Sequence, residues 1–299
     1  MLRNCISTFI IILIGVNCLA QTSSFYKKSD TLNTKRRNTV IITETALSIG
    51  TLVALDKLWY SGYSRSNFHF INDNNQWKQL DKMGHVMTSY YFGKIGMDVL
   101  DWSGVSKKNQ IIYGATFGFS FLTAVEILDG FSTKWGASWG DIAANASGTG
   151  LLIGQELVWK EQRILLKYSF SQSDYAKQRP NTLGETFLQQ TLKDYNGQTY
   201  WLSANIWSFN KDSNFPKWLN IALGYGADGM LYGETNPTNA LVQDPYRQFY
   251  LSVDLDLTKI KTNSKFLKTL FSTINFIKIP APALEYNTKN GFKFHYLHF

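Results

Sequence analysis

The stretch S-W-G-D-I-A-A-N-A-S-G-T-G, residues 138–150, joins the start of a helix to polar groups inside an apolar segment. Ser138 is a good N-cap, and Asp141 three residues later is an acidic variant of the capping box. The pattern predicts a helix from about Ser138 to Trp159. Asp141 and Asn145 are one helical turn apart, so both project from one face. Polar groups in an apolar helix are costly unless they pair with one another or with a ligand, which makes this helix a candidate part of a site.

Two other apolar segments also contain a polar motif: D-K-M-G-H at 81–85 and E-I-L-D-G at 126–130. The first holds an Asp and a His one helical turn apart, and the second holds a Glu and an Asp three residues apart, so each pair shares a helix face. We therefore expect a single polar cluster where three helices meet. Its predicted members are Asp81, Lys82, His85, Glu126, Asp129, Asp141 and Asn145.

The segments that carry these groups belong to an N-terminal half with helical spacing of apolar residues. The spacing predicts four helices, at about 37–60, 75–100, 107–128 and 138–159. The last two contain apolar runs of roughly 17 residues, near the lower limit for a membrane span. A mean hydropathy of −0.18 is low for a polytopic membrane protein, so we favour a compact helical bundle that leans on a bilayer. True membrane spans remain the alternative.

After Arg163 the sequence changes from helical spacing to alternation of apolar and polar residues. Alternation predicts strands within 200–209, 218–232 and 248–257. In the last of these, Leu251 and Val253 share one face and Ser252 and Asp254 the other, as in a half-buried antiparallel strand. Short helices are expected at 180–195 and 265–276. The predicted fold class is therefore α+β, with a four-helix-bundle-like domain followed by an antiparallel β-rich half.

The C-terminal segment predicts a hairpin, because residues 283–286 and 292–299 flank an Asn-Gly turn. Its aromatic residues alternate and the chain ends on Phe299, a pattern similar to the closing strand of outer-membrane barrels. The five or six predicted strands are fewer than the roughly eight of the smallest such barrel. We therefore favour a sheet that is soluble or faces a membrane.

The first twenty residues predict a signal peptide. An apolar run at 6–16 precedes Cys18-Leu19-Ala20, a small-residue cleavage site. Lipidation of Cys18 is an alternative, although Asn17 fits a lipobox poorly. Cys5 and Cys18 are the only cysteines, so a chain cleaved after Ala20 would have no thiol chemistry.

These patterns divide the chain into four parts: a signal peptide at 1–20, a flexible arm at 21–36, the helical domain at 37–162, and the β-rich domain at 163–299, for which association with an outer membrane is one interpretation. The net charge is +8, but the basic residues are scattered and no nucleic-acid motif accompanies them. We expect no nucleic-acid partner. An envelope lipid or glycan is the favoured partner of an exported basic protein, in the periplasm or outer membrane of a Gram-negative bacterium. The sequence leaves the oligomeric state open.

The chemistry of the polar cluster has three interpretations. His85 and its carboxylates could bind a ligand, could perform acid–base catalysis with Asp81 as a partner, or could only fix the helix register. The sequence has no H-E-x-x-H motif, and one histidine among carboxylates is weak evidence for zinc. We therefore expect no metal and no cofactor, and we favour a protein that is not an enzyme.

Taken together, D-K-M-G-H, E-I-L-D-G and W-G-D-I-A-A-N-A-S-G resemble the uncharacterised envelope family typified by the periplasmic lipoprotein YfiM. They are more distantly similar to VanZ-like membrane proteins, which share a D-K-x-x-H helix, a later Glu and a D-x-x-x-N-x-x-G helix. The resemblance covers about 78–160 and implies a helical domain in the cell envelope, without an established reaction. The VanZ-like similarity implies a membrane-embedded site that faces lipid-linked or glycopeptide chemistry. The poor lipobox and the β-rich half depart from the pattern.

Overall fold

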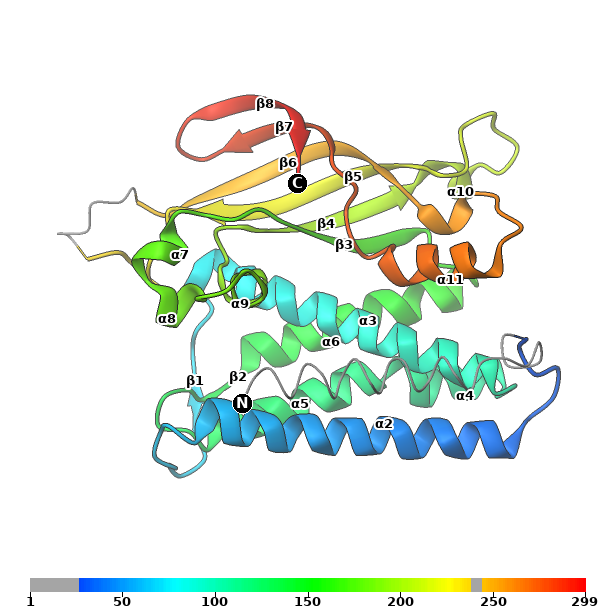
Figure 1. Ribbon diagram of the computed structural model, residues 1–299, viewed down its shortest axis with the longest axis horizontal. Helices are drawn as coiled ribbons and strands as arrows, with labels where there is room; N and C mark the ends of the chain where they lie inside the picture. The colour runs from blue at the N-terminus through cyan, green and yellow to red at the C-terminus, as the bar shows by residue number, and fades with distance from the viewer. Residues whose placement is uncertain (1–26, 238–243) are drawn as a thin grey trace.

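The computed structural model describes residues 27–237 and 244–299. It places helices in the N-terminal half and a six-stranded antiparallel sheet in the C-terminal half, which confirms the predicted α+β class. Figure 1 shows the sheet as one layer and the helices as layers below it, with α3 directly under the sheet. The predicted signal peptide and its cleavage site lie outside the described residues.

The helical half is close to the sequence prediction, with shifted boundaries. Its main elements are α2 (Thr34–Leu55), the π-helical turn η2 (Asp56–Tyr60), α3 (Leu80–Trp102), α4 (Lys107–Asn109), the π-helical turn η4 (Gln110–Ala115), α5 (Phe117–Gly130) and α6 (Trp139–Val158). α2 begins three residues before the predicted start because the Asn33 side chain accepts a hydrogen bond from the Arg36 N–H and caps it. Ser138 caps α6 as predicted, by accepting from the Asp141 N–H.

The predicted third helix is divided into α4, η4 and α5. The π-helical turn η4 lies directly against α3, and Gly114 packs on Gly96 so closely that a Cβ on either residue would overlap the other's backbone. A π-helical turn of this kind re-aims a helix locally. The contact brings α3 and η4 together, and the spacing of apolar residues did not predict it.

α3 begins at Leu80, five residues after the predicted start. Trp77, Lys78 and Gln79 have left-handed φ angles of 49°, 50° and 65°, so the 3-10 segment η3 (Gln76–Gln79) does not continue into α3. Just before it, β1 (Phe70–Ile71) pairs in parallel with β2 (Ala137–Ser138). This pairing holds the segment before α3 against the N-terminus of α6.

The sheet has its strands in sequence order, β3 to β8. The strands are β3 (Ile164–Phe170), β4 (Gln198–Asn205), β5 (Leu219–Asp228), β6 (Tyr246–Leu255), β7 (Ala281–Asn287) and β8 (Gly291–His298). The last two form the predicted hairpin. Between strands lie α7 (Tyr175–Gln178), α8 (Pro180–Leu183), α9 (Phe187–Lys193), α10 (Ile206–Phe209), the 3-10 turn η5 (Leu257–Lys259) and α11 (Lys265–Ile274). The segment predicted as one helix at 180–195 is therefore two short helices, because Gly184 adopts a φ of 107° between them.

The alternation of β6 is correctly predicted, but its outer face is the apolar one. Leu251 and Val253 are exposed, whereas Ser252 and Asp254 are buried. A sheet that covers an apolar core along its whole width has the opposite pattern. Here the apolar face covers the helical core near β3, where Leu166, the register partner of Leu202, packs with Tyr90 of α3 and Leu152 of α6.

Two helical stretches are long and apolar enough to cross a membrane by length and composition: Thr34–Leu55 and Lys107–Gly130. Within α2 only Val40 is buried, and α2 lies on the side of the helical layer away from the sheet (Figure 1).

Candidate functional site

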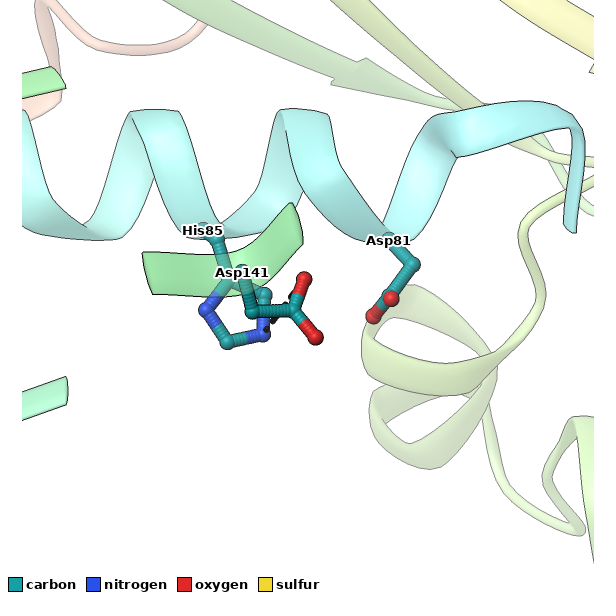
Figure 2. Close-up of side chains that lie close together, drawn as sticks. All are labelled: Asp81, His85 and Asp141. Atoms are coloured by element: carbon teal, nitrogen blue, oxygen red, sulfur yellow. Dashed lines mark ion pairs between the residues drawn. The ribbon is translucent and has the colours of Figure 1, made fainter. Parts of the chain in front are cut away.

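The predicted polar groups come together where α3, α5 and α6 meet. The start of α3 contributes Asp81, Lys82 and His85. Figure 2 shows Asp81 and His85 on one side of this helix, with the Asp141 carboxylate of α6 beside the imidazole. The structure adds Asp73, from the loop after β1. The polar cluster, as we use the term below, consists of Asp73, Asp81, Lys82, His85, Glu126, Asp129, Asp141 and Asn145.

Lys82 is the centre of one side of the cluster. Its Nζ lies 2.7 Å from Asp73 Oδ2, 2.8 Å from Asp141 Oδ1 and 3.0 Å from Asp81 Oδ2. Burial lowers the pKa of Lys82, but its carboxylate partners outweigh burial and hold this pKa above its ordinary value. The ammonium therefore stays charged and ties three chain segments together.

Asp73 was missed by sequence reasoning because it lies in a polar loop with no helical spacing. Its Oδ1 accepts a 2.6 Å hydrogen bond from the Ser138 hydroxyl, the same hydroxyl that caps α6. Burial raises the pKa of Asp73, but the hydrogen bonds from Lys82 and Ser138 lower it by a larger amount. The pKa of Asp73 therefore lies below its ordinary value. The β1–β2 pairing that brings Asp73 here involves strands of two residues each, which give almost no sequence signal.

His85 occupies the other side of the cluster. Its Nδ1 is 3.1 Å from Asn145 Oδ1, and because an amide oxygen only accepts, Nδ1 carries the proton. The other ring nitrogen, Nε2, is 3.7 Å from Asp141 Oδ1 and 3.9 Å from Glu126 Oε1. These distances exceed a hydrogen bond. Nε2 thus faces two carboxylate oxygens beyond hydrogen-bond distance, an arrangement that becomes favourable when a proton or another cation lies between them.

The carboxyl groups around His85 hold their protons more tightly than usual. Burial raises the pKa of Glu126 to about 7, although its Oε2 accepts a 2.9 Å hydrogen bond from the Ser138 N–H. Burial, with a contribution from Asp81, raises the pKa of Asp141 to about 6. Burial also raises the pKa of Asp129 to about 6, and its Oδ1 accepts a 2.7 Å hydrogen bond from the Tyr60 hydroxyl. Negative charge is therefore in excess here.

The cluster is closed on one side and reaches solvent on the other. Glu126 and Asp141 side chains are 3% and 7% exposed, and Asn145 is fully buried. The side chains of Asp81 and His85 are 23% and 19% exposed. Asn145 Nδ2 has no hydrogen-bond partner among residues 27–237 and 244–299. The arrangement is thus neither an open cleft nor a fully sealed network.

Carboxylate and imidazole groups this close together are typical ligands of a divalent cation. Asp81, His85 and Asp141 each offer a ligand atom, and these atoms lie within 4.8 Å of one another. However, the Lys82 ammonium contacts both of these carboxylates and already supplies a positive charge there. A metal would have to compete with this lysine, so the donor set fits a metal poorly.

Comparison with known proteins gives one match. The model of a family described as predicted periplasmic lipoprotein (DUF2279) matches residues 69–153, a range that contains the whole polar cluster. No curated protein and no solved structure matches the chain. The chain is therefore similar, over this helical part, to an uncharacterised periplasmic lipoprotein family, and this similarity supports its export to the periplasm.

Proposed function

We propose that the protein is a non-enzymatic component of the cell envelope that binds a cationic head group, the amine of a lipid or glycan, at the polar cluster. The observation that carries this proposal is the position of His85 Nε2, which faces Asp141 Oδ1 and Glu126 Oε1 at 3.7 and 3.9 Å with no hydrogen bond. We also propose that the three helical motifs are related to those of YfiM-like and VanZ-like proteins, and that the protein is located at the outer membrane.

A primary ammonium group suits this position for a simple electrostatic reason. It carries three donors and a positive charge, while the atoms around His85 are acceptors. Carboxylates that lose water are costly unless a cation compensates them. Lys82 does so for Asp141, whereas Glu126 has, among the described residues, only His85 Nε2 at 3.9 Å as an ion-pair partner and is the carboxylate that a bound amine would compensate. The His85 and Asp81 side chains are partly exposed, so this side of the cluster is in contact with solvent.

The test is calorimetric titration of the purified protein with short-chain phosphatidylethanolamine, with the matched phosphatidylglycerol as the non-amine probe. We expect saturable binding of the amine lipid alone, and a loss of at least tenfold in affinity in Glu126→Gln, whose amide has no negative charge. Glu185→Gln, an exposed residue distant in the chain, is the matched control. Equal binding of both lipids, or unchanged affinity in Glu126→Gln with its fold intact by circular dichroism, would overturn the proposal.

A second candidate is an envelope hydrolase or transferase acting on a lipid-linked substrate. The observation that favours it is that Glu126, with its pKa raised to about 7, lies beside the partly exposed His85, because a carboxyl group that titrates near neutrality next to an imidazole suits acid–base catalysis. Turnover of a fluorogenic phospholipid that His85→Gln abolishes, while amine-lipid binding persists, would favour this candidate. A cluster that neither binds nor turns over any such lipid would be a structural network.

A further inference from the structure

One face of the six-stranded sheet is polar and buried, and we call it the inner face; the opposite, outer face is apolar. On the inner face Lys167 Nζ pairs with Asp254 Oδ2 at 2.8 Å, and both side chains are fully buried. Ser203 and Asn220 lie on the same face and are also fully buried, in hydrogen bonds with Asp254 and with each other. The opposite, apolar face packs on the helical layer near β3 and β4, through Leu166 and Tyr200, and is exposed at Leu223, Leu251 and Leu284 on the later strands.

The outer face is ordered in rows that cross the strands. One row, which we call the aliphatic row although its last member is a phenylalanine, consists of direct register partners on β4 to β8: Leu202, Leu223, Leu251, Leu284 and Phe294. Every member is between 41% and 58% exposed. Five strands at a spacing of roughly 4.8 Å make this aliphatic row about 20 Å long. A soluble monomer seldom leaves so continuous an apolar row uncovered.

An aromatic row borders the aliphatic row on one side. Tyr225, Phe249, Tyr286 and Phe292 are register partners on β5 to β8, and the last three are exposed. On the other side, Ile221 and Val253 continue the exposed apolar surface. An aliphatic band with an aromatic border and a polar interior is the arrangement of sheets that contact lipid.

A basic rim follows the apolar surface at the end where β5 begins and β6 ends. Lys217, Lys259 and Lys261 line a hollow there together with Trp218, and its lining residues include no carboxylate. The Lys217 Nζ lies 4.2 Å from the centre of the Trp207 ring. Figure 1 shows α10 and α11 at this same end of the sheet.

α11 has the composition of a helix that lies at a membrane surface. The side chains of Phe266, Leu267 and Leu270 are exposed. Lys265 and Lys268 lie beside them in the sequence of the helix. Apolar residues on one face and lysines beside them suit the boundary between acyl chains and anionic head groups. The helix therefore extends the apolar surface and the basic rim together.

We propose that this outer face of the sheet is a lipid-binding surface, with the aliphatic row in contact with the hydrocarbon of a bilayer and the lysine rim at the level of anionic head groups. The surface lies in the other half of the chain from the polar cluster and does not depend on the head-group proposal above. Charge complementarity selects the occupant, because the rim is basic and no carboxylate lines it.

A local probe tests this surface without interference from other apolar parts of the chain. In a full-length background with Cys5→Ser and Cys18→Ser, Leu223→Cys and Leu284→Cys each carry an environment-sensitive fluorophore, and Glu185→Cys is the matched exposed control. With vesicles of phosphatidylglycerol and phosphatidylcholine containing doxyl-labelled lipid, we expect strong quenching at 223 and 284 and little at 185. These positions are exposed, so the substitutions leave folding intact.

The lysine rim has its own readout in the same assay. In Lys217→Gln/Lys259→Gln/Lys261→Gln, vesicle affinity at low salt should fall roughly fivefold for each lysine removed, since each basic residue near an anionic surface contributes about 1 kcal/mol. Vesicles of phosphatidylcholine alone should bind the variant and the parent equally. Quenching at position 223 that is no greater than at position 185 would overturn the proposal. Cross-linking between two copies of the chain through position 223 in the absence of vesicles would also overturn it, because a second copy would then cover the surface.

Discussion

Replacing Lys82 by methionine should destabilise the protein strongly, and more so as the pH rises. The lysine side chain is 12% exposed, and its three carboxylate partners lie within 2.7–3.0 Å. Removing one member of a buried ion pair costs about 3–5 kcal/mol, because the partner charges remain uncompensated. Since Asp81 is partly exposed, we take the lower end and expect about 3 kcal/mol at pH 7.5, measured by urea denaturation.

The pH dependence of this loss follows from the carboxyl groups that Lys82 leaves behind. A carboxyl group whose folded pKa is raised, such as Asp141 at about 6, stabilises the fold at low pH and loses that contribution as the pH rises through the folded pKa. Without Lys82 the pKa of Asp73, now held low by this lysine, also rises. The difference in unfolding free energy between the variant and the parent should therefore shrink to about 1 kcal/mol at pH 5.

Lys94→Met is the matched control, because Lys94 lies on the same helix and pairs with an exposed Asp98 at 2.6 Å. An exposed pair of this kind should contribute less than about 1 kcal/mol at either pH. If Lys82→Met lost no more than Lys94→Met, or lost the same amount at pH 5 and pH 7.5, the description of Lys82 as the charge-compensating centre of the cluster would be wrong.

Three further predictions concern other parts of the structure. Glu126→Gln should raise the unfolding free energy by about 1–2 kcal/mol at pH 8, because the pKa of Glu126 is about 7 and ionising it in the fold is costly; the gain should vanish at pH 4.5 in the same denaturation assay, and an equal gain at both pH values would contradict the assignment. Gly114→Ala should lower the melting temperature by an amount corresponding to at least about 2 kcal/mol, because its Cβ meets the backbone of α3; an unchanged melting temperature would show that η4 moves away freely. Burial lowers the pKa of His298 to about 4, so the fold should lose about 1–2 kcal/mol as the pH falls from 6.5 towards 4, and His298→Phe should reduce this loss; a melting-temperature profile with the same acid slope in both proteins would refute it.

The parts of the fold that the sequence predicts are those with a repeated pattern. Ser138 and Asp141 predicted the start of α6, and the Asn-Gly turn predicted the last hairpin, because capping and turn chemistry depend on neighbouring residues in the sequence. The polar spacing on three helices also predicted which groups would meet. Asp73 could not be predicted, because it reaches the cluster through a long-range pairing of two-residue strands.

Periodicity does not show which face of a strand is covered. The alternation in β6 fixed which residues share a face, yet the apolar face, with Leu251, is the exposed one. The opposite face of β6 is buried because Asp254 pairs there with Lys167, and these two residues are 87 positions apart in the sequence. Similarly, the left-handed residues before Leu80 depend on contacts with later segments, such as the 2.5 Å hydrogen bond from the Trp77 N–H to the Gly233 carbonyl.

The central claim is that His85 Nε2 belongs to an acceptor site that a head-group amine fills. The most direct measurement is the ¹⁵N NMR spectrum of the His85 imidazole during titration with short-chain phosphatidylethanolamine. We predict that the free protein shows the Nδ1-protonated tautomer, and that the Nε2 resonance moves saturably with the amine lipid, remains in place with phosphatidylglycerol, and responds far less in Glu126→Gln. An Nε2 resonance that the amine lipid leaves unchanged, or a free protein with the proton on Nε2, would contradict the account.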